Sequence, residues 1–325
     1  RHRPPVGAVE HWDRQPVAEF DDEPFGGLLA DSGHQRERCD IVVGHDVEER
    51  RRRVGRQDRN GERGADAMGG DHAPDAIVEG AAQASLSSQV NLLLVGDQTV
   101  LRRLLARHPH HPDRIDIVHA SAVVGMDAKP QEALRTHPDA SILVATRLLE
   151  SGQADALVSA GNTGACILAA AQHLSRIPGI RRTALAAVYP TERRHGPQGD
   201  PFALILDVGA TLDATAEDLV RFALMGSAYA QVISRNPRPR VALLSNGEEA
   251  IKGSPEIVAA HARLSAHPQL NFMGNVEGVD IPRGTADVIV CNGFVGNIVL
   301  KMLEGMAEVV EEIARYAMER KVLWK

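Results

Sequence analysis

From Ala65 onward the sequence alternates short apolar runs with segments of helical period, and this alternation limits the possible folds more than any other feature. The runs hold three to six residues, which is the length of a strand, and the segments between them can form helices. Such alternation is typical of an α/β fold with a mostly parallel sheet flanked by helices. The predicted strands are 90–95, 115–118, 156–158, 184–188, 202–206, 241–244, 270–273 and 288–290.

Two of the intervening segments, 140–151 and 216–234, have the clearest helical character. The second segment repeats apolar or small residues at three- and four-residue spacing, namely Leu219, Phe222, Ala223, Gly226, Tyr229 and Ile233. This spacing places them on one face of a helix. We expect that face to belong to the core or to a subunit interface.

Residues 1–64 lack this regularity. They contain 12 Arg and no Lys, together with 14 acidic residues, and show no sustained period of a helix or a strand. We interpret them as a disordered or non-native extension, followed by a catalytic domain at 65–325. Because the residues just before Ala65 are polar (Arg59 to Gly64), we also expect the first strand of that domain to be missing or degraded.

Charge and composition exclude several classes of protein. A net charge of -7 and a pI near 6.1 argue against a general binder of nucleic acids or of anionic membranes. The apolar runs are too short to span a membrane, and the first residues lack the apolar centre of a secretory signal. Three widely spaced cysteines fit a reducing cytoplasm, and Cys166 and Cys291 are expected to be buried rather than nucleophilic.

Four of the predicted strands end in a turn that contains glycine and Asn or Asp. These turns are SAGNTG at 159–164, DVGAT at 207–211, SNGEE at 245–249 and CNGFVGN at 291–297. The carboxyl ends of parallel strands are where open α/β sheets bind ligands. Glycine there allows positive φ angles or close approach of the backbone, and successive N–H groups can bind an anion. Glycine that only ends a strand is the plainer reading of any one turn.

Amides and hydroxyls at these strand ends suit a ligand rich in oxygen, and phosphate is the simplest candidate. Lys252 and Lys301 follow two of the turns and could supply positive charge, although a solvated lysine is equally compatible with their positions. The sequence contains no GxxxxGK[ST] motif and no GxGxxG motif after a first strand, which argues against nucleotide hydrolysis and against nicotinamide binding.

Six ordered motifs closely resemble those of the PlsX-type phosphate acyltransferases of bacterial phospholipid synthesis. They are DAMGGDHAP, VSAGNTGA, LDVGAT, NGEEAIKG, FMGNVEGVDI and GFVGNIVLKMLEG, and the resemblance runs from Ala65 to about residue 314. Members of that family continue beyond the point where this chain stops. We therefore expect the domain at 65–325 to be truncated at its C-terminus.

The resemblance implies a fold similar to the isocitrate and isopropylmalate dehydrogenases, with a cleft at the carboxyl ends of the strands. It implies transfer of a fatty acyl group from acyl carrier protein to inorganic phosphate, giving acyl phosphate. It further implies a cytoplasmic homodimer that associates peripherally with the inner membrane and needs no cofactor or metal. Nucleic acid is not an expected partner.

The candidate site residues come from the motifs. We assign catalysis to Lys252, Asn162 and Lys301, with Lys252 and the turn of Asn162 holding phosphate. The expected substrate-binding residues are Asp66, Gly69, Gly70, Asp71, His72, Gly161, Thr163, Gly164, Asp207, Asn246, Glu248, Asn275, Asn292, Gly293, Gly296 and Asn297.

Two other functions remain open at this stage. A phosphotransacetylase-like enzyme acting on acyl coenzyme A would use the same phosphate chemistry, and a catalytically inactive fragment would bind the same ligands without turnover. A stretch interpreted as a loop, 190–201, and a helical stretch, 251–267, could each serve a dimer or a membrane. The preferred acyl-chain length does not follow from the sequence.

Overall fold

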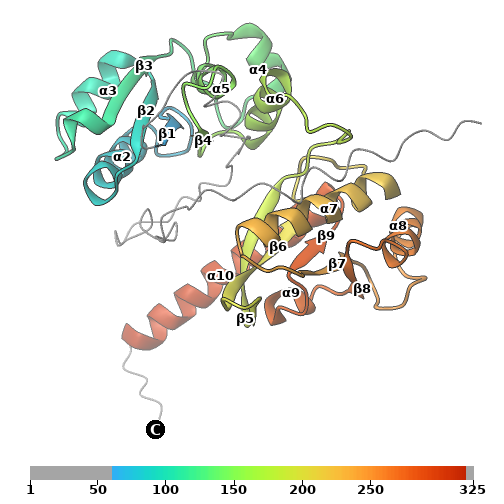
Figure 1. Ribbon diagram of the computed structural model, residues 1–325. Helices are drawn as coiled ribbons and strands as arrows, with labels where there is room; N and C mark the ends of the chain where they lie inside the picture. Colours follow the sequence, from blue (N-terminus) through green and yellow to red (C-terminus); the bar gives the residue numbers. More distant parts are fainter. Residues whose placement is uncertain (1–60, 320–325) are drawn as a thin grey trace, which may run out of the picture.

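The computed structural model describes residues 61–319, which form two α/β lobes (Figure 1). The first lobe, residues 61–173, has a four-stranded sheet in the order β3-β2-β1-β4, and all of its strand pairs are parallel. Its strands are β1 (Glu62–Asp66), β2 (Asn91–Gly96), β3 (Ile115–His119) and β4 (Ala156–Val158). Its helices are α2 (Asp75–Ser87), α3 (Gln98–Leu105), η2 (Pro112–Arg114), α4 (Pro130–Thr136), α5 (Ser141–Glu150) and α6 (Thr163–His173).

The second lobe, residues 186–319, has a five-stranded sheet in the order β5-β6-β9-β7-β8. Only the pair of β5 and β6 is antiparallel. The strands are β5 (Ala186–His195), β6 (Asp200–Leu206), β7 (Arg240–Leu244), β8 (Asn271–Val276) and β9 (Val288–Val290). The helices are α7 (Ala216–Val232), α8 (Pro255–Ser265), α9 (Asp280–Arg283) and α10 (Gly293–Glu319).

The predicted class, a mostly parallel sheet flanked by helices, is therefore confirmed, with the strands divided between two sheets. Each predicted strand and both predicted helices occur near the expected positions, although β5 continues seven residues beyond the predicted end at residue 188. The stretch 190–201 is not a loop, because it forms most of the β5–β6 hairpin. Within residues 61–319, no helix is both long and apolar enough to cross a membrane.

The first strand, expected to be missing, is present as β1 and lies at the centre of its sheet. Its sequence is ERGAD, and it pairs with β2 on one side and β4 on the other. The polar residues at its start are held by Asp155, whose Oδ2 accepts the N–H of Glu62 at 2.9 Å and lies 3.7 Å from Nη1 of Arg63. Residues 1–60, which make up most of the predicted extension, lie outside the described range.

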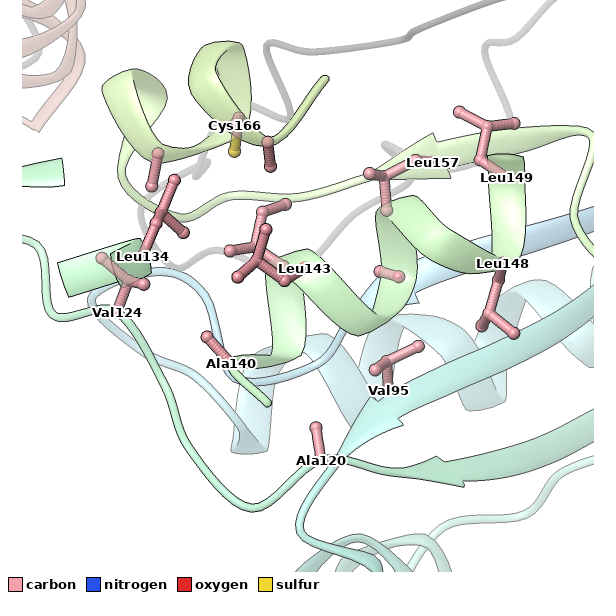
Figure 2. Close-up of a cluster of buried hydrophobic side chains, with 14 of the residues drawn as sticks. Val95, Ala120, Val124, Leu134, Ala140, Leu143, Leu148, Leu149, Leu157 and Cys166 are labelled. Atoms are coloured by element: carbon pink, nitrogen blue, oxygen red, sulfur yellow. The ribbon is translucent and has the colours of Figure 1, made fainter. Parts of the chain in front are cut away.

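The core of the first lobe forms around α5, which packs against β1, β2 and α6 (Figure 2). Val95, Leu143, Leu149 and Leu157 are almost fully buried there. Burying each such side chain stabilises the fold by about 1.5–3 kcal/mol. This packing fixes the ends of β1 and β4, from which two of the candidate turns extend.

Helix α7 covers the sheet of the second lobe, and its first half has the predicted apolar face. Leu219, Phe222 and Ala223 are buried, whereas Tyr229 and Ile233 near its end are exposed. Gly226 lets the helix approach the sheet closely, because a Cβ atom there would lie 2.5 Å from Cγ1 of Val288. The predicted face therefore serves the core over the first half of the helix.

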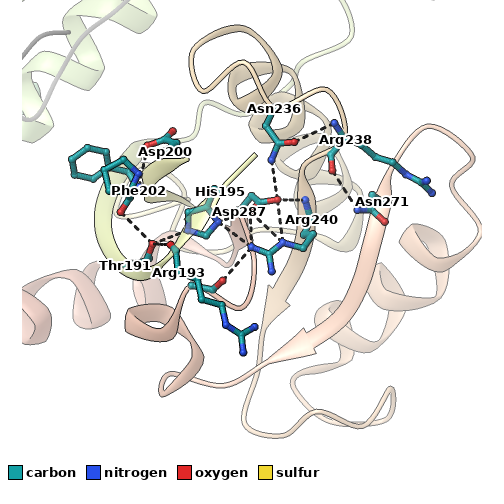
Figure 3. A network of polar contacts seen from close by, with 12 residues as sticks. Thr191, Arg193, His195, Asp200, Phe202, Asn236, Arg238, Arg240, Asn271 and Asp287 are labelled. Carbon is teal, nitrogen blue, oxygen red and sulfur yellow. Dashed lines mark hydrogen bonds and ion pairs between the residues drawn. The ribbon is translucent and has the colours of Figure 1, made fainter. Parts of the chain in front are cut away.

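A polar network lies at the end of the second sheet where its parallel strands begin (Figure 3). Buried Asp287 accepts hydrogen bonds from the backbone N–H of Arg240 at 2.5 Å, from Nη2 of Arg240 at 2.8 Å and from Nδ2 of Asn236 at 3.1 Å. Nδ1 of buried His195 also contacts Asp287, and its Nε2 lies 2.7 Å from Oγ1 of Thr191. The network joins the β5–β6 hairpin to the starts of β7 and β9.

The ionisation of Asp287 links this network to pH. Burial alone would raise the pKa of Asp287, but hydrogen bonds from His195 and Arg240, together with the charge of Arg240, hold that pKa well below its usual range. The unfolded chain, with the ordinary pKa of 3.8, therefore takes up a proton first as pH falls. The stabilising contribution is complete above that pH and is lost in more acidic solution.

We predict that Asp287→Asn lowers the free energy of unfolding at pH 7 by about 3 kcal/mol, because a buried ion pair is broken from one side. Urea unfolding of wild type and variant should show this difference shrinking below about pH 4, because Asp287 of the unfolded wild-type chain is then protonated and the stabilising contribution of its charge is lost. Asp213→Asn, at an exposed position, is the matched control and should change stability little. A difference that stays constant down to pH 2 would contradict this account.

Candidate active site

Two of the candidate turns touch each other in the first lobe. The turn after β1 carries Asp66, Gly69 and Gly70, and the turn after β4 carries Ser159 and Gly161. A Cβ atom on Gly69 would lie 2.9 Å from Cα of Gly161, and one on Gly161 would lie 3.2 Å from Cα of Gly69. The two glycines are thus required by backbone contact between the turns, whereas Gly70 is required by its φ of 115°.

Asp66 lies buried beneath this contact. Its Oδ2 accepts a hydrogen bond from Oγ of Ser159 at 2.9 Å, and its Oδ1 accepts one from the N–H of Met68 at 3.3 Å. Burial raises the pKa of Asp66, and the hydrogen bonds offset part of that rise. Asp66 therefore supports the two turns from inside, while Asp71 and His72 are exposed.

The side chain of Asn162 holds a neighbouring loop against the start of α6. Its Oδ1 accepts the N–H of Ala165 at 3.1 Å and so caps the helix. Its Nδ2 lies 3.4, 3.0 and 3.2 Å from the carbonyl oxygens of Gly125, Met126 and Ala128. Both ends of the amide are engaged, so the geometry gives Asn162 a positioning role rather than direct contact with a ligand.

Thr163 and Gly164 form the first turn of α6. Their backbone N–H groups precede the first hydrogen bonds within the helix, which is where helices attract anions. Gly164 is also required by packing, because a Cβ atom there would lie 2.7 Å from Cγ of Pro130. The turn therefore presents backbone N–H donors, whereas the amide of Asn162 is already hydrogen-bonded within the protein.

In the second lobe, the carboxylate of Asp207 organises the turn after β6. Its Oδ1 accepts the N–H groups of Leu185 at 2.9 Å and of Gly209 and Ala210 at 3.0 Å, and its Oδ2 accepts that of Thr211 at 2.6 Å. The side chain is fully buried. Asp207 therefore shapes the turn, and its carboxylate is occupied by four backbone donors.

The N-terminus of α10 packs directly on this turn. The N–H of Gly293 donates to the carbonyl of Thr211 at 2.8 Å, and a Cβ atom on Gly296 would lie 1.9 Å from the carbonyl oxygen of Asp207. Asn292 caps the helix through its Oδ1, which accepts the N–H of Val295 at 2.9 Å. Asn297 is exposed and lies beside Gly209, because a Cβ atom on that glycine would lie 3.7 Å from its Oδ1.

A third group forms where β7 and β8 end. Nδ2 of buried Asn275 donates to the carbonyl of Glu249 at 2.9 Å, and its Oδ1 has no hydrogen-bond partner among the described residues. Asn246, Glu248 and Lys252 are exposed around this turn. Lys301 is also exposed, but its ammonium lies 3.0 Å from Oε2 of Glu304 on the same helix.

The structure thus collects the predicted residues into groups rather than one pocket. The groups are 66–72 with 159–164, Asp207 with 292–297, and 246–252 with Asn275. Of the expected phosphate-binding residues, Asn162, Thr163 and Gly164 lie in the first lobe and Lys252 lies in the second. The hydrogen bonds described above join residues of the same lobe. A shared cleft stays a prediction.

Ser159 is not among the candidate site residues predicted from the sequence, although it directly follows a strand and its hydroxyl joins the two turns of the first lobe. The prediction that Cys166 and Cys291 are buried is confirmed. Burial raises the pKa of the Cys166 thiol to about 11 and that of Cys291 to about 12, so both stay protonated at neutral pH.

Comparison with solved structures gives distant likenesses. A branched-chain phosphotransacylase from Enterococcus faecalis is 16% identical with a TM-score of 0.46, covering 75% of this chain and 84% of that one. A putative 4-hydroxythreonine-4-phosphate dehydrogenase from Salmonella typhimurium is 17% identical with a TM-score of 0.43, covering 76% of this chain and 85% of that one.

Comparison of sequences gives much nearer relatives. The phosphate acyltransferase of Heliobacterium modesticaldum is 48% identical over 251 residues, which cover 77% of this chain and 72% of the relative. That of Gloeothece citriformis is 43% identical over 250 residues, covering 77% and 70%. A family model described as "Fatty acid synthesis protein" matches residues 63–325. The resemblance seen in the motifs is confirmed, and this chain belongs to the phosphate acyltransferases of the fatty acid synthesis protein family.

Proposed function

We propose that this chain transfers a fatty acyl group from the thioester of acyl carrier protein to inorganic phosphate, producing acyl phosphate for phospholipid synthesis. The observation that carries the proposal is the identity of 48% to a phosphate acyltransferase over 72% of its length. The glycine turns at the carboxyl ends of β4, β6, β7 and β9 add a chemical reason, because they present backbone donors at one edge of each sheet.

The reaction does not need a strong general base. An oxygen of phosphate attacks the thioester carbonyl carbon, the new O–C bond forms, and the C–S bond breaks as the thiolate leaves and takes up a proton. Phosphate carries negative charge near neutral pH and is already nucleophilic. The protein has to orient phosphate against the carbonyl and stabilise the oxyanion that forms.

The contacts within the structure suggest a division of roles. Lys252 and the first N–H groups of α6, from Thr163 and Gly164, are the groups we assign to phosphate and oxyanion binding. Asn297, which is exposed beside Gly209, is a further donor that we assign to this site. Asn162 and Asp207 act as positioning residues, because their polar atoms are engaged by the backbone.

The proposal includes a cytoplasmic homodimer that contacts the membrane surface. Helix α10 supports self-association, because it exposes an apolar stripe at three- and four-residue spacing. The stripe consists of Ile298, Met302, Met306, Val309, Ile313 and Tyr316, each more than half exposed. A continuous apolar stripe of exposed side chains is unusual on a monomeric protein and marks an interface with another protein or with lipid.

We predict that Lys252→Ala raises the KM for phosphate about 10- to 100-fold, which corresponds to the loss of one charge-assisted hydrogen bond. Lys252→Arg should recover part of the loss. The measurement is acyl phosphate formation at limiting phosphate, and Arg103→Ala, at an exposed cation of α3 outside the candidate turns, is the control. Unchanged kinetics in Lys252→Ala would remove Lys252 from the site.

The donor is tested by comparing palmitoyl-acyl carrier protein with palmitoyl-coenzyme A at equal concentration. We expect phosphate-dependent cleavage of both thioesters, with a kcat/KM at least about tenfold higher for the carrier protein because only the protein offers an extended contact surface. A preference for the coenzyme A thioester would favour the phosphotransacetylase-like alternative. Absence of turnover with either donor would favour an inactive fragment.

We predict that Met306→Glu with Ile313→Glu converts the protein from a dimer to a monomer, because charges would then lie in the apolar stripe. Light scattering after size exclusion should report a fall from twice the chain mass to its 35.0 kDa. Ala307→Glu with Ala314→Glu, on another face of the same exposed helix, should leave the mass unchanged. A stripe variant that stays dimeric would exclude α10 as the dimer contact.

A further inference from the structure

Five arginines gather on the side of the second lobe where the chain enters it. We name this set, Arg176, Arg181, Arg182, Arg221 and Arg263, the entry surface. The first three belong to the connecting segment 174–185, which contains no Asp or Glu. The whole chain has a net charge of -7, so a local excess of positive charge is a specific feature rather than a reflection of composition.

Side-chain contacts tie the connecting segment to α7. Nη1 of Arg176 donates to the carbonyl of Arg181 at 2.7 Å, and Nη2 of Arg181 donates to Oδ2 of Asp218 at 2.9 Å. A Cβ atom on Gly179 would lie 3.4 Å from Nη1 of Arg221. The guanidinium groups are therefore held in a defined arrangement by the backbone and by α7.

Helix α8 completes the surface through a shared acidic residue. Glu217 pairs with Arg221 at 2.8 Å and with Arg263 at 2.8 Å. Counting Glu217 and Asp218 against the five arginines leaves three positive charges on the entry surface. Arg181 and Arg263 have side chains that are 60% and 54% exposed despite their ion pairs, so their charge faces solvent.

The entry surface adjoins the Asp207 turn of the candidate active site. Oγ1 of Thr211 donates to the carbonyl of Thr183 at 2.8 Å, one residue after Arg182. The N–H of Leu185 donates to Asp207 at 2.9 Å, and the N–H of Val208 returns a hydrogen bond to the carbonyl of Leu185 at 3.0 Å. A molecule bound at these arginines would thus lie next to the turn.

We propose that the entry surface is the docking site for an acidic protein, which under the proposed function is the acyl carrier protein. Arginine forks bind carboxylates in a fixed geometry, and complementary charge steers a protein partner to its site. Ile177, which is 51% exposed among the arginines, adds the apolar contact that protein interfaces need. The exposed carboxylate of Glu217 among the arginines favours a partner of mixed charge over the uniformly negative surface of a membrane.

The experiment uses Arg176→Glu with Arg182→Glu, which reverses charge but leaves the ion pairs of Asp218 and Glu217 in place. The control is Arg102→Glu with Arg103→Glu, two exposed arginines on α3 of the first lobe. Binding of a purified bacterial acyl carrier protein is measured by biolayer interferometry over a range of salt. Thermal melts check folding, and Arg182→Gln is the milder variant if the double variant melts early.

We expect the entry-surface variant to weaken carrier binding at low salt about 10- to 100-fold and to flatten its salt dependence, because like charges would then oppose the acidic partner. The control should bind as wild type does. Cleavage of palmitoyl-coenzyme A by phosphate should be equal in all three proteins. Carrier binding reports on the docking site even if no thioester is cleaved, so failure of the proposed function is seen separately.

Three results would overturn the docking site. The first is carrier binding that is undetectable or unaffected by the entry-surface variant, and the second is an equal loss in the α3 control. The third comes from vesicles that contain phosphatidylglycerol: if they bind wild type through Arg176 and Arg182 while the carrier protein does not, the surface is a membrane contact instead.

Discussion

The carboxylate of Asp207 is the contact on which most of the second lobe's candidate site depends. It gathers four backbone N–H groups, three from its own turn and one from Leu185 in the connecting segment. A buried carboxylate is costly unless its oxygens are satisfied, and here the backbone satisfies them. The same turn receives the N-terminus of α10 through Thr211. The side chain of Asp207 thereby sets the positions of a turn, a helix and the link between the lobes.

The same principle changes how the glycines and amides of the motifs are interpreted. Gly69, Gly161 and Gly296 are needed because backbone approaches backbone, at distances that a Cβ atom would forbid. Asn162 uses both ends of its amide to fix a loop and cap α6. Many residues of the motifs therefore build the turns, and the polar groups that stay available to a ligand are N–H groups at helix starts and exposed cations such as Lys252.

The sequence predicts regular elements well, because apolar periodicity records which face of each strand or helix is buried. It does not predict β1, because the residues at the start of this strand are polar and are held in the sheet by pairing with β2 and β4 and by Asp155. It also fails for the network of His195 and Asp287, two residues 92 positions apart. The turns were found as motifs, but the choice between positioning and binding depended on hydrogen bonds that no single sequence displays.

The two ends of the second sheet serve different purposes, and this separation follows from strand direction. Parallel strands bring their carboxyl ends to one edge, where Asp207, Asn292 and Asn297 lie, and their starts to the other, where Asp287 and Arg240 pair. At the second edge His195, Asn236 and the backbone satisfy the buried charge of Asp287, and this network stabilises the fold. Because the buried charge of Asp287 lies where the strands begin, the edge formed by their carboxyl ends can expose N–H donors and cations, which suit an anionic substrate.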